Sequence, residues 1–162
     1  MSRLFHLAAL LSIAPLALAA SVATAGPAPA SSLYYGRWAV SEDRPVFTAR
    51  GREYKTIDLA PCGKDFCGVS VADNGRCGPV LFRFLGHRAL DSNQDYLRGH
   101  GKWGAAKKNV VIYAYDDTDA TPVKRSIELY LGEGYDFGER SGSMPKFHAG
   151  YARTGKALCK AR

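Results

Sequence analysis

Short apolar runs recur along this 162-residue chain, and they constrain its fold more than any other feature. The runs alternate apolar with polar residues or are rich in β-branched and aromatic types, and Gly, Pro, Asn and Asp separate them. They are residues 34–40, 54–60, 66–71, 80–85, 96–103, 110–115, 126–131 and 147–153. Ile57 and Leu59, for example, alternate with Thr56 and Asp58, as a strand with one face in a core requires. The pattern predicts about eight strands.

Helical periodicity is missing from the chain, and residues 87–93 alone would form a turn or two of helix. Many short antiparallel strands in one domain hide their edges either by closing into a barrel or by packing as two sheets. We therefore predict an all-β domain over residues 33–162, a small antiparallel barrel of lipocalin-like type, with a β-sandwich as the alternative. This length suits one domain with one core.

The first 25 residues have the pattern of a cleaved export signal. Arg3 supplies the positive start, residues 7–20 are almost wholly apolar, and Ala23-Thr24-Ala25 forms a small-residue cleavage site. A retained anchor is the alternative, but the apolar run is shorter than the roughly 20 residues that span a bilayer. We expect residues 1–25 to be removed and residues 26–32 to form a flexible leader. The mature protein should then be periplasmic or secreted, without stable insertion into a membrane.

Four cysteines in an exported chain indicate two disulfides. They are Cys62, Cys67, Cys77 and Cys159, and no earlier cysteine offers a thiol for a lipid anchor. Cys62 and Cys67 flank a short Gly-containing connection between two predicted strands, which places them nearly opposite each other across a hairpin. We therefore predict that Cys62 pairs with Cys67 and Cys77 with Cys159. A metal site or a redox-active pair is the alternative, but the chain lacks C-x-x-C spacing.

A short motif set lies within residues 36–71. It consists of Gly36-Arg37-Trp38 at the first predicted strand, then Cys62-Gly63 at the end of a strand, a short turn, and Cys67-Gly68. This arrangement resembles a family of small secreted bacterial domains of unknown function that share G-x-W and a paired Cys-Gly hairpin. The resemblance implies a lipocalin-like fold, and it brings no catalytic residues.

The resemblance is weaker elsewhere in the chain. Tyr151-Ala152-Arg153 matches the aromatic residue and the Arg with which the family tends to close. Cys77, Cys159 and residues 132–147 depart from the family pattern.

The charge balance permits an anionic partner. Removing the first 25 residues removes Arg3 and no acidic residue, so 21 basic and 15 acidic residues remain. This excess attracts anionic envelope polymers, lipid headgroups or acidic ligands, although the basic residues are scattered as on an ordinary solvated surface. Nucleic acid is not an expected partner, because export places the protein on the other side of a membrane.

Six residues are candidates for contact with a ligand. They are Tyr34, Tyr35, Trp38, Trp103, Tyr135 and Arg140. Residues 132–147 form a long loop that would cover the mouth of a barrel as a lid. In that position Arg140 would bind an anionic group through two hydrogen bonds, and the aromatic side chains would cover an apolar body. The alternative is a packed surface loop without a ligand.

Other patterns have simpler structural explanations. Residues 99–104 match G-x-G-x-x-G, but a predicted strand follows instead of the helix that binds a dinucleotide. We expect these glycines to permit a bend where strands crowd, with Trp103 at the end of the barrel. Residues 116–119 carry three Asp, yet they lack the Gly and the distant Glu of a calcium loop. A hairpin turn is the simpler interpretation.

No catalytic group stands out in the sequence. His87, His100 and His148 are each isolated, G-x-S-x-G is absent, and nothing singles out a pair of carboxylates. We predict non-catalytic binding of a small amphipathic or anionic envelope ligand, without a cofactor or metal. A scaffold that acts as an interaction or inhibitor module is the alternative, and an enzyme comes third. A large cavity inside the barrel would favour the ligand, and a filled interior would favour the scaffold.

Overall fold

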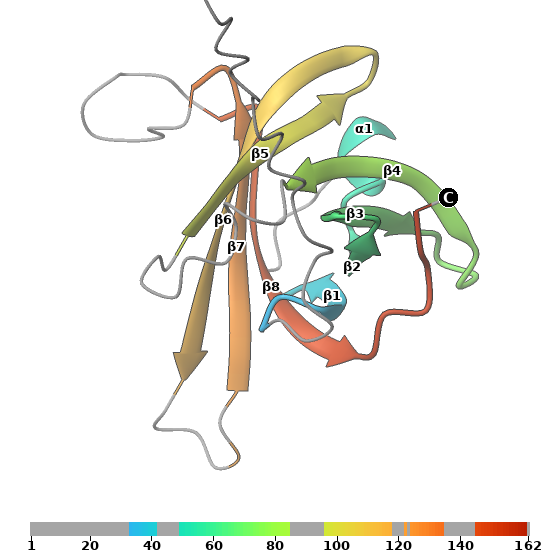
Figure 1. Ribbon diagram of the computed structural model, residues 1–162, viewed down its shortest axis with the longest axis vertical. Coiled ribbons are helices and arrows are strands. Elements are labelled where there is room, and N and C mark those ends of the chain that lie inside the picture. Colours follow the sequence, from blue (N-terminus) through green and yellow to red (C-terminus); the bar gives the residue numbers. More distant parts are fainter. Residues whose placement is uncertain are drawn as a thin grey trace, which may run out of the picture.

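Eight antiparallel strands close into a barrel in the computed structural model, which describes residues 33–41, 49–84, 96–117, 122, 124–134 and 145–161. The strands follow one another in sequence order, and β1 closes the barrel by pairing with β8 (Figure 1). Their bounds are β1 (Gly36–Val40), β2 (Thr56–Cys62), β3 (Asp65–Val71), β4 (Cys77–Phe84), β5 (Tyr96–Trp103), β6 (Ala106–Asp117), β7 (Lys124–Gly132) and β8 (Phe147–Gly155). One helical turn, α1 (Ala49–Arg52), lies between β1 and β2. The predicted all-β barrel is confirmed.

Most strands extend the predicted runs by a few residues at their ends. β6 begins at Ala106, four residues before the predicted run, and this earlier start brings Lys107 into the sheet. The predicted export signal over residues 1–25, the leader over residues 26–32 and the helical turn over residues 87–93 lie outside the described residues.

Large side chains fill the interior of the barrel. On β7, Ile127, Leu129 and Leu131 are fully buried, whereas the residues between them are half-exposed, as strand alternation requires. Equivalent rows from the other strands meet them in one apolar cluster. The bulkiest buried side chains are those of Trp38, Tyr54, Phe66, Phe82, Phe84 and Tyr151. The interior is therefore a packed core, which is the outcome expected of the scaffold alternative.

Aromatic side chains also close the two ends of the barrel. At the end where β5 turns into β6, the Tyr54 ring packs against Phe147 with ring centroids 4.9 Å apart. The Tyr54 hydroxyl donates to the carbonyl of Lys102, and the Tyr151 hydroxyl donates to the carbonyl of Tyr54 at 2.7 Å. At the opposite end the Phe66 ring stacks on Phe84 at 5.0 Å.

The glycines of residues 99–104 have the packing role expected from the sequence. A Cβ atom at Gly99 would lie 2.4 Å from the carbonyl oxygen of Arg83, and one at Gly101 would lie 2.5 Å from the Val110 side chain. Gly104 has a φ of +62° in the turn from β5 to β6, a conformation that favours glycine. Trp103 packs at the end of the barrel against Tyr54. A strand follows the motif, so the structure lacks the helix of a dinucleotide site.

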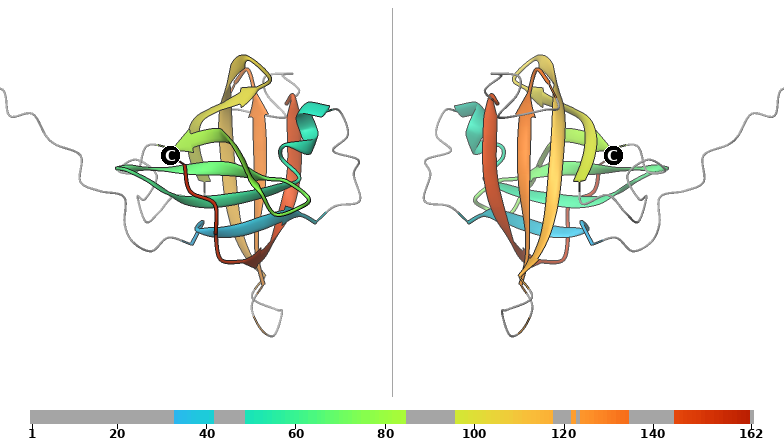
Figure 2. Two further views of the ribbon diagram at one scale, coloured as in Figure 1. Left: turned by 90° about the vertical axis from the view of Figure 1, so that its right-hand side faces the viewer. Right: turned by 90° about the vertical axis from the view of Figure 1, so that its left-hand side faces the viewer.

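Both predicted disulfides are present. Cys62 and Cys67 are joined across the β2–β3 hairpin, with Cα atoms 5.8 Å apart. Cys77 at the start of β4 is joined to Cys159, with Cα atoms 5.5 Å apart. We call residues 156–161 the strap, because they leave β8 and pass outside β1, β2 and β3 to reach Cys77 (Figure 2).

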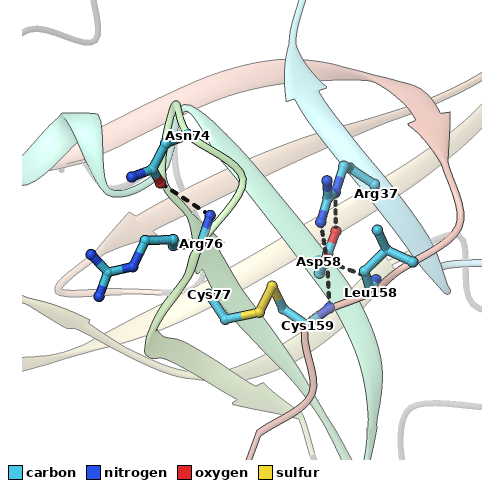
Figure 3. Close-up of a disulfide and its surroundings, with 7 residues drawn as sticks. All are labelled: Arg37, Asp58, Asn74, Arg76, Cys77, Leu158 and Cys159. Carbon is cyan, nitrogen blue, oxygen red and sulfur yellow. Dashed lines mark hydrogen bonds and ion pairs between the residues drawn. A yellow bond between two sulfur atoms is a disulfide. The ribbon is translucent and has the colours of Figure 1, made fainter.

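The strap is held by a buried carboxylate as well as by the disulfide. Asp58 points outward from β2 and is fully buried beneath the strap. It accepts two 2.8 Å hydrogen bonds from the Arg37 guanidinium and one each from the backbone N–H groups of Leu158 and Cys159, at 2.9 and 2.7 Å (Figure 3). Burial alone raises the pKa of Asp58, but these hydrogen bonds outweigh it and leave the pKa below its ordinary value.

A second apolar cluster forms under the strap. Val69 and Val71 on the outer face of β3 pack with Cys159, and the partly buried Val80 and Ala161 lie against them. All seven residues of β3 are buried. Phe66 meets the barrel core on one face of the strand, and Val69 and Val71 meet the strap on the other.

Candidate functional site

Of the six residues predicted to contact a ligand, the four that the structure describes do not gather in one place. Tyr34 and Tyr35 pack against Phe66 at one end of the barrel, and Trp103 lies at the opposite end. Trp38 is fully buried and donates from Nε1 to the carbonyl of Tyr34 at 2.8 Å. Their role in ligand contact stays a prediction.

The middle of the predicted lid lies outside the described residues, whereas Gly132 and Phe147 at its two ends belong to β7 and β8. Tyr135, Arg140 and residues 135–144 in general are not among the described residues. The same holds for His87 and for residues 118 and 119 of the Asp-rich segment. Residues 116 and 117 form the end of β6.

A cleft opens instead at the weakest seam of the barrel, between β4 and β5. β6 pairs with β7 continuously from Asn109 to Asp117, whereas β4 pairs with β5 only through Phe82 with Gly101 and Arg83 with His100. Beyond that contact the two strands diverge (Figure 1). The divergence leaves a cleft of about 410 Å³ that opens to the surface. This volume is within the range of small-ligand sites, roughly 300–1,000 Å³.

A bulge in β4 explains why the strands separate there. Gly68 pairs with Phe82, and the next residue of β3, Val69, pairs with Val80, so Leu81 is an extra residue on β4. A bulge of this kind bends its strand and strengthens the local twist. Gly68 is required opposite it, because a Cβ there would lie 2.2 Å from the Phe82 ring.

The base of the cleft is apolar. Val80, Leu81 and Phe82 line it from β4, and Gly101 and Ala105 line it from β5 and the following turn. Leu81 and Phe82 are each 2% exposed and belong to the barrel core, and Val80 is half-buried. An apolar chain placed here would extend the core outward.

The rim of the cleft is cationic. Its charged or titratable side chains are those of Arg83, His100, Lys102 and Lys107. Lys102 and Lys107 are direct register partners on β5 and β6, and both are exposed. Arg83 contacts the Asp65 carboxylate at 3.3 Å, whereas neither lysine ammonium forms an ion pair within the described residues.

Two lysines directly opposite each other oppose folding. Like charges at such cross-strand positions destabilise a sheet by roughly 0.2–1 kcal/mol. Nothing in the fold requires a cation at either position, since both side chains point into solvent. An anion bound between the ammonium groups would relieve the repulsion, so the pair is suited to bind a carboxylate, sulfate or phosphate group.

Two other clefts lack a pair of lysines in register above an apolar base. One, of about 930 Å³, is lined by Lys124, Arg125, Arg153 and Lys156. In register, however, Lys124 and Arg125 lie opposite Asp117 and Asp116, and the lining includes no large apolar side chain. The other, of about 820 Å³, lies beside the strap.

The sequence contained a signal for the lysine pair. A two-residue turn at Gly104-Ala105 necessarily sets Lys102 close to Lys107 if both belong to strands. The strand predicted after this turn begins only at residue 110, so the prediction leaves Lys107 out of the sheet. The apolar base gave no such signal, since it depends on the bulge.

The described residues contain no cluster of three or more His, Cys, Asp and Glu side chains that would hold a metal ion. They also contain no helix long and apolar enough to cross a membrane. Comparisons with protein-family models, with curated proteins and with solved structures gave no match.

Proposed function

We propose that this is an exported, non-catalytic protein that binds an amphipathic anion in the cleft between β4 and β5. The observation that carries the proposal is the Lys102–Lys107 pair above an apolar base of Val80, Leu81 and Phe82. The anionic group would lie between the ammonium groups, and the apolar body would lie against the base. Export is supported by the two disulfides and by the signal-like residues 1–25.

Decanoate is a suitable probe because it carries one carboxylate on an unbranched apolar chain. Calorimetric titration should detect decanoate binding and much weaker binding of decanol, which has the same chain without the charge. The double variant Lys102→Gln/Lys107→Gln should weaken decanoate binding by about tenfold, or roughly 1.4 kcal/mol. Raising the salt concentration should weaken it too, because both ammonium groups are exposed.

The matched control is Lys64→Gln/Lys156→Gln, which removes the same net charge from exposed positions outside the cleft. It should leave the affinity within about twofold of the parent. Equal losses in the two double variants would reduce the effect to net charge and contradict a site at the seam.

The filled barrel also supports the alternative of a scaffold that acts through its surface. The two proposals differ in where they place binding. If decanoate fails to bind at low salt while the protein remains folded, the amphipathic-anion proposal is wrong and the scaffold is favoured.

A further inference from the structure

The outer face of β5–β8 carries an aromatic surface unrelated to the cleft. We call it the tyrosine face and define it as Tyr96, Tyr113, Tyr115, Tyr130 and His148, with Arg98 and Glu128 among them. Strand alternation explains its composition. Val110 and Ile112 of β6 face the core, so Tyr113 and Tyr115 of the same strand face outward. Figure 2 shows β6, β7 and β8 side by side on this side of the barrel.

The rings form a continuous row across four strands. Tyr96 packs with Tyr113 at 5.6 Å between ring centroids, and Tyr113 meets Tyr130 edge-on at 5.7 Å. Tyr130 stacks on the His148 ring at 4.0 Å. These contacts fix the orientation of the rings before any partner arrives, so little side-chain entropy remains to be lost on binding.

A single carboxylate lies in the middle of this row. Glu128 is the register partner of Tyr113, and its Oε2 accepts a 2.8 Å hydrogen bond from the Tyr130 hydroxyl. His148 Nε2 lies 3.6 Å from the same oxygen. No Lys or Arg among the described residues pairs with Glu128, whose side chain is 35% exposed.

The hydroxyls of Tyr130 and Tyr115 remain protonated beside this charge. Burial raises the pKa of Tyr130, and the hydrogen bond to Glu128 raises it further. For Tyr115 the causes are burial first and then the negative charge of Glu128. The face therefore presents aromatic rings around the Glu128 carboxylate, with its own cation, Arg98, over the Tyr96 ring, on a protein whose net charge is +7. It is suited to a positively charged partner, in contrast to the β4–β5 cleft.

We propose that the tyrosine face binds an arginine side chain presented by a partner protein. A guanidinium group stacks on aromatic rings and donates hydrogen bonds to a carboxylate, and this face offers rings together with Glu128, whose Oε2 already accepts from Tyr130. The protein's own Arg98 shows that the surface accepts the group, because its guanidinium carbon lies 5.2 Å from the centre of the Tyr96 ring. Tyr and Arg are also the residues that dominate protein interfaces.

A short capped peptide tests the proposal without knowledge of the partner. Acetyl-Gly-Arg-Gly-amide is titrated into the isotope-labelled, oxidised full-length protein, and backbone amide shifts are followed by NMR. The control peptide replaces Arg with citrulline, which has nearly the same shape but no charge. The arginine peptide should shift β6 and β7 amides around Tyr113 and Glu128 in a saturable way, at least fivefold more tightly than the citrulline peptide.

Two variants separate the site from the fold. Glu128→Gln retains an acceptor for the Tyr130 hydroxyl but removes the charge, and it should weaken arginine-peptide binding at least fivefold. Ser126→Ala, on the same strand and face, should leave the affinity unchanged. Thermal melting of each variant establishes that it is folded.

Equal binding of the two peptides, or unchanged binding to Glu128→Gln, would overturn the proposal. Choline is the third probe, compared with its uncharged analogue 3,3-dimethylbutan-1-ol. Choline binding that is tighter than that of the arginine peptide would replace the protein partner with an ammonium headgroup. None of these outcomes depends on Lys102 or Lys107, so they are independent of the anion proposal.

Discussion

The outer surfaces of the two halves of the barrel differ, although the strands alternate in the same way in both. On β2 and β3, outward residues such as Asp58, Val69 and Val71 are buried under the strap. On β6 and β7, the corresponding outward positions hold Tyr113, Tyr115 and Glu128, and Tyr115 is 47% exposed. The comparison teaches that the first half uses its outer face for stability, which leaves the outer face of the second half available for binding.

Releasing the strap should have the largest effect on the stability that distinguishes the two halves. The double variant Cys77→Ala/Cys159→Ala opens a link between residues 82 apart in sequence, and on the chain-entropy model it should cost roughly 4.5 kcal/mol. Cys62→Ala/Cys67→Ala, with a separation of 5, should cost about 2 kcal/mol. Urea denaturation of the oxidised proteins measures both free energies of unfolding.

Hydrogen exchange then shows which half is affected. Release of the strap should increase exchange at amides of β2 and β3 much more than at amides of β6 and β7. A uniform increase over all strands would mean that the strap stabilises the barrel as a whole, and the contrast between the halves would fail.

Removal of the Asp58 carboxylate should have the next largest effect. Asp58→Ala leaves the Arg37 guanidinium and two backbone N–H groups without their acceptor, and we expect a loss of roughly 3 kcal/mol. Glu128→Ala on the other half removes a carboxylate that is one-third exposed and should cost less than about 1 kcal/mol. Similar losses for the two variants would contradict the assignment of stability to the strap side.

The pH dependence of stability should follow Asp58. Its pKa is lower in the folded protein than in the unfolded chain, so its contribution is present above the ordinary carboxyl pKa of about 4. The contribution is lost as the pH falls through the lowered value. The difference in unfolding free energy between the parent and Asp58→Asn, measured by urea denaturation, should therefore shrink at acid pH. A difference that stays constant from pH 6 to the lowest pH at which the protein folds would contradict the assignment of this pH dependence to Asp58.

The smallest effect concerns the seam between the halves. Lys102→Gln/Lys107→Gln should leave stability unchanged or raise it by roughly 0.2–1 kcal/mol, because the repulsion between register partners disappears. A drop in melting temperature would show that the lysines are structural and would weaken the case for an anion between them.

The barrel and its disulfides could be predicted because their signals are local. Alternation within each run indicates a strand, and the spacing of Cys62 and Cys67 across a turn fixes the first disulfide and leaves the second by elimination. The strap could not be predicted. Asp58 reads as an ordinary polar position in an alternating strand, and its burial depends on residues 100 positions later in the chain.

The candidate sites depend on contacts between strands, which the sequence indicates less well. The cleft requires the Leu81 bulge, which arises where Gly68 meets the Phe82 ring. The tyrosine face requires the register that aligns Tyr113 with Glu128 and Tyr130 with His148. Isolated tyrosines in separate strands look like core residues until this register is known.

The position of the strap has a consequence for biosynthesis. Synthesis proceeds from the N-terminus, so a nascent chain that ends before residue 147 lacks β8, which β1 needs as its neighbour. It also lacks the backbone N–H groups that donate hydrogen bonds to Asp58. Folding can finish only after β8 and Cys159 have emerged. Under the export that we propose, the incomplete polypeptide would still be open enough to pass through a translocation channel, and the Cys77–Cys159 disulfide would form on the far side, where thiols are oxidised.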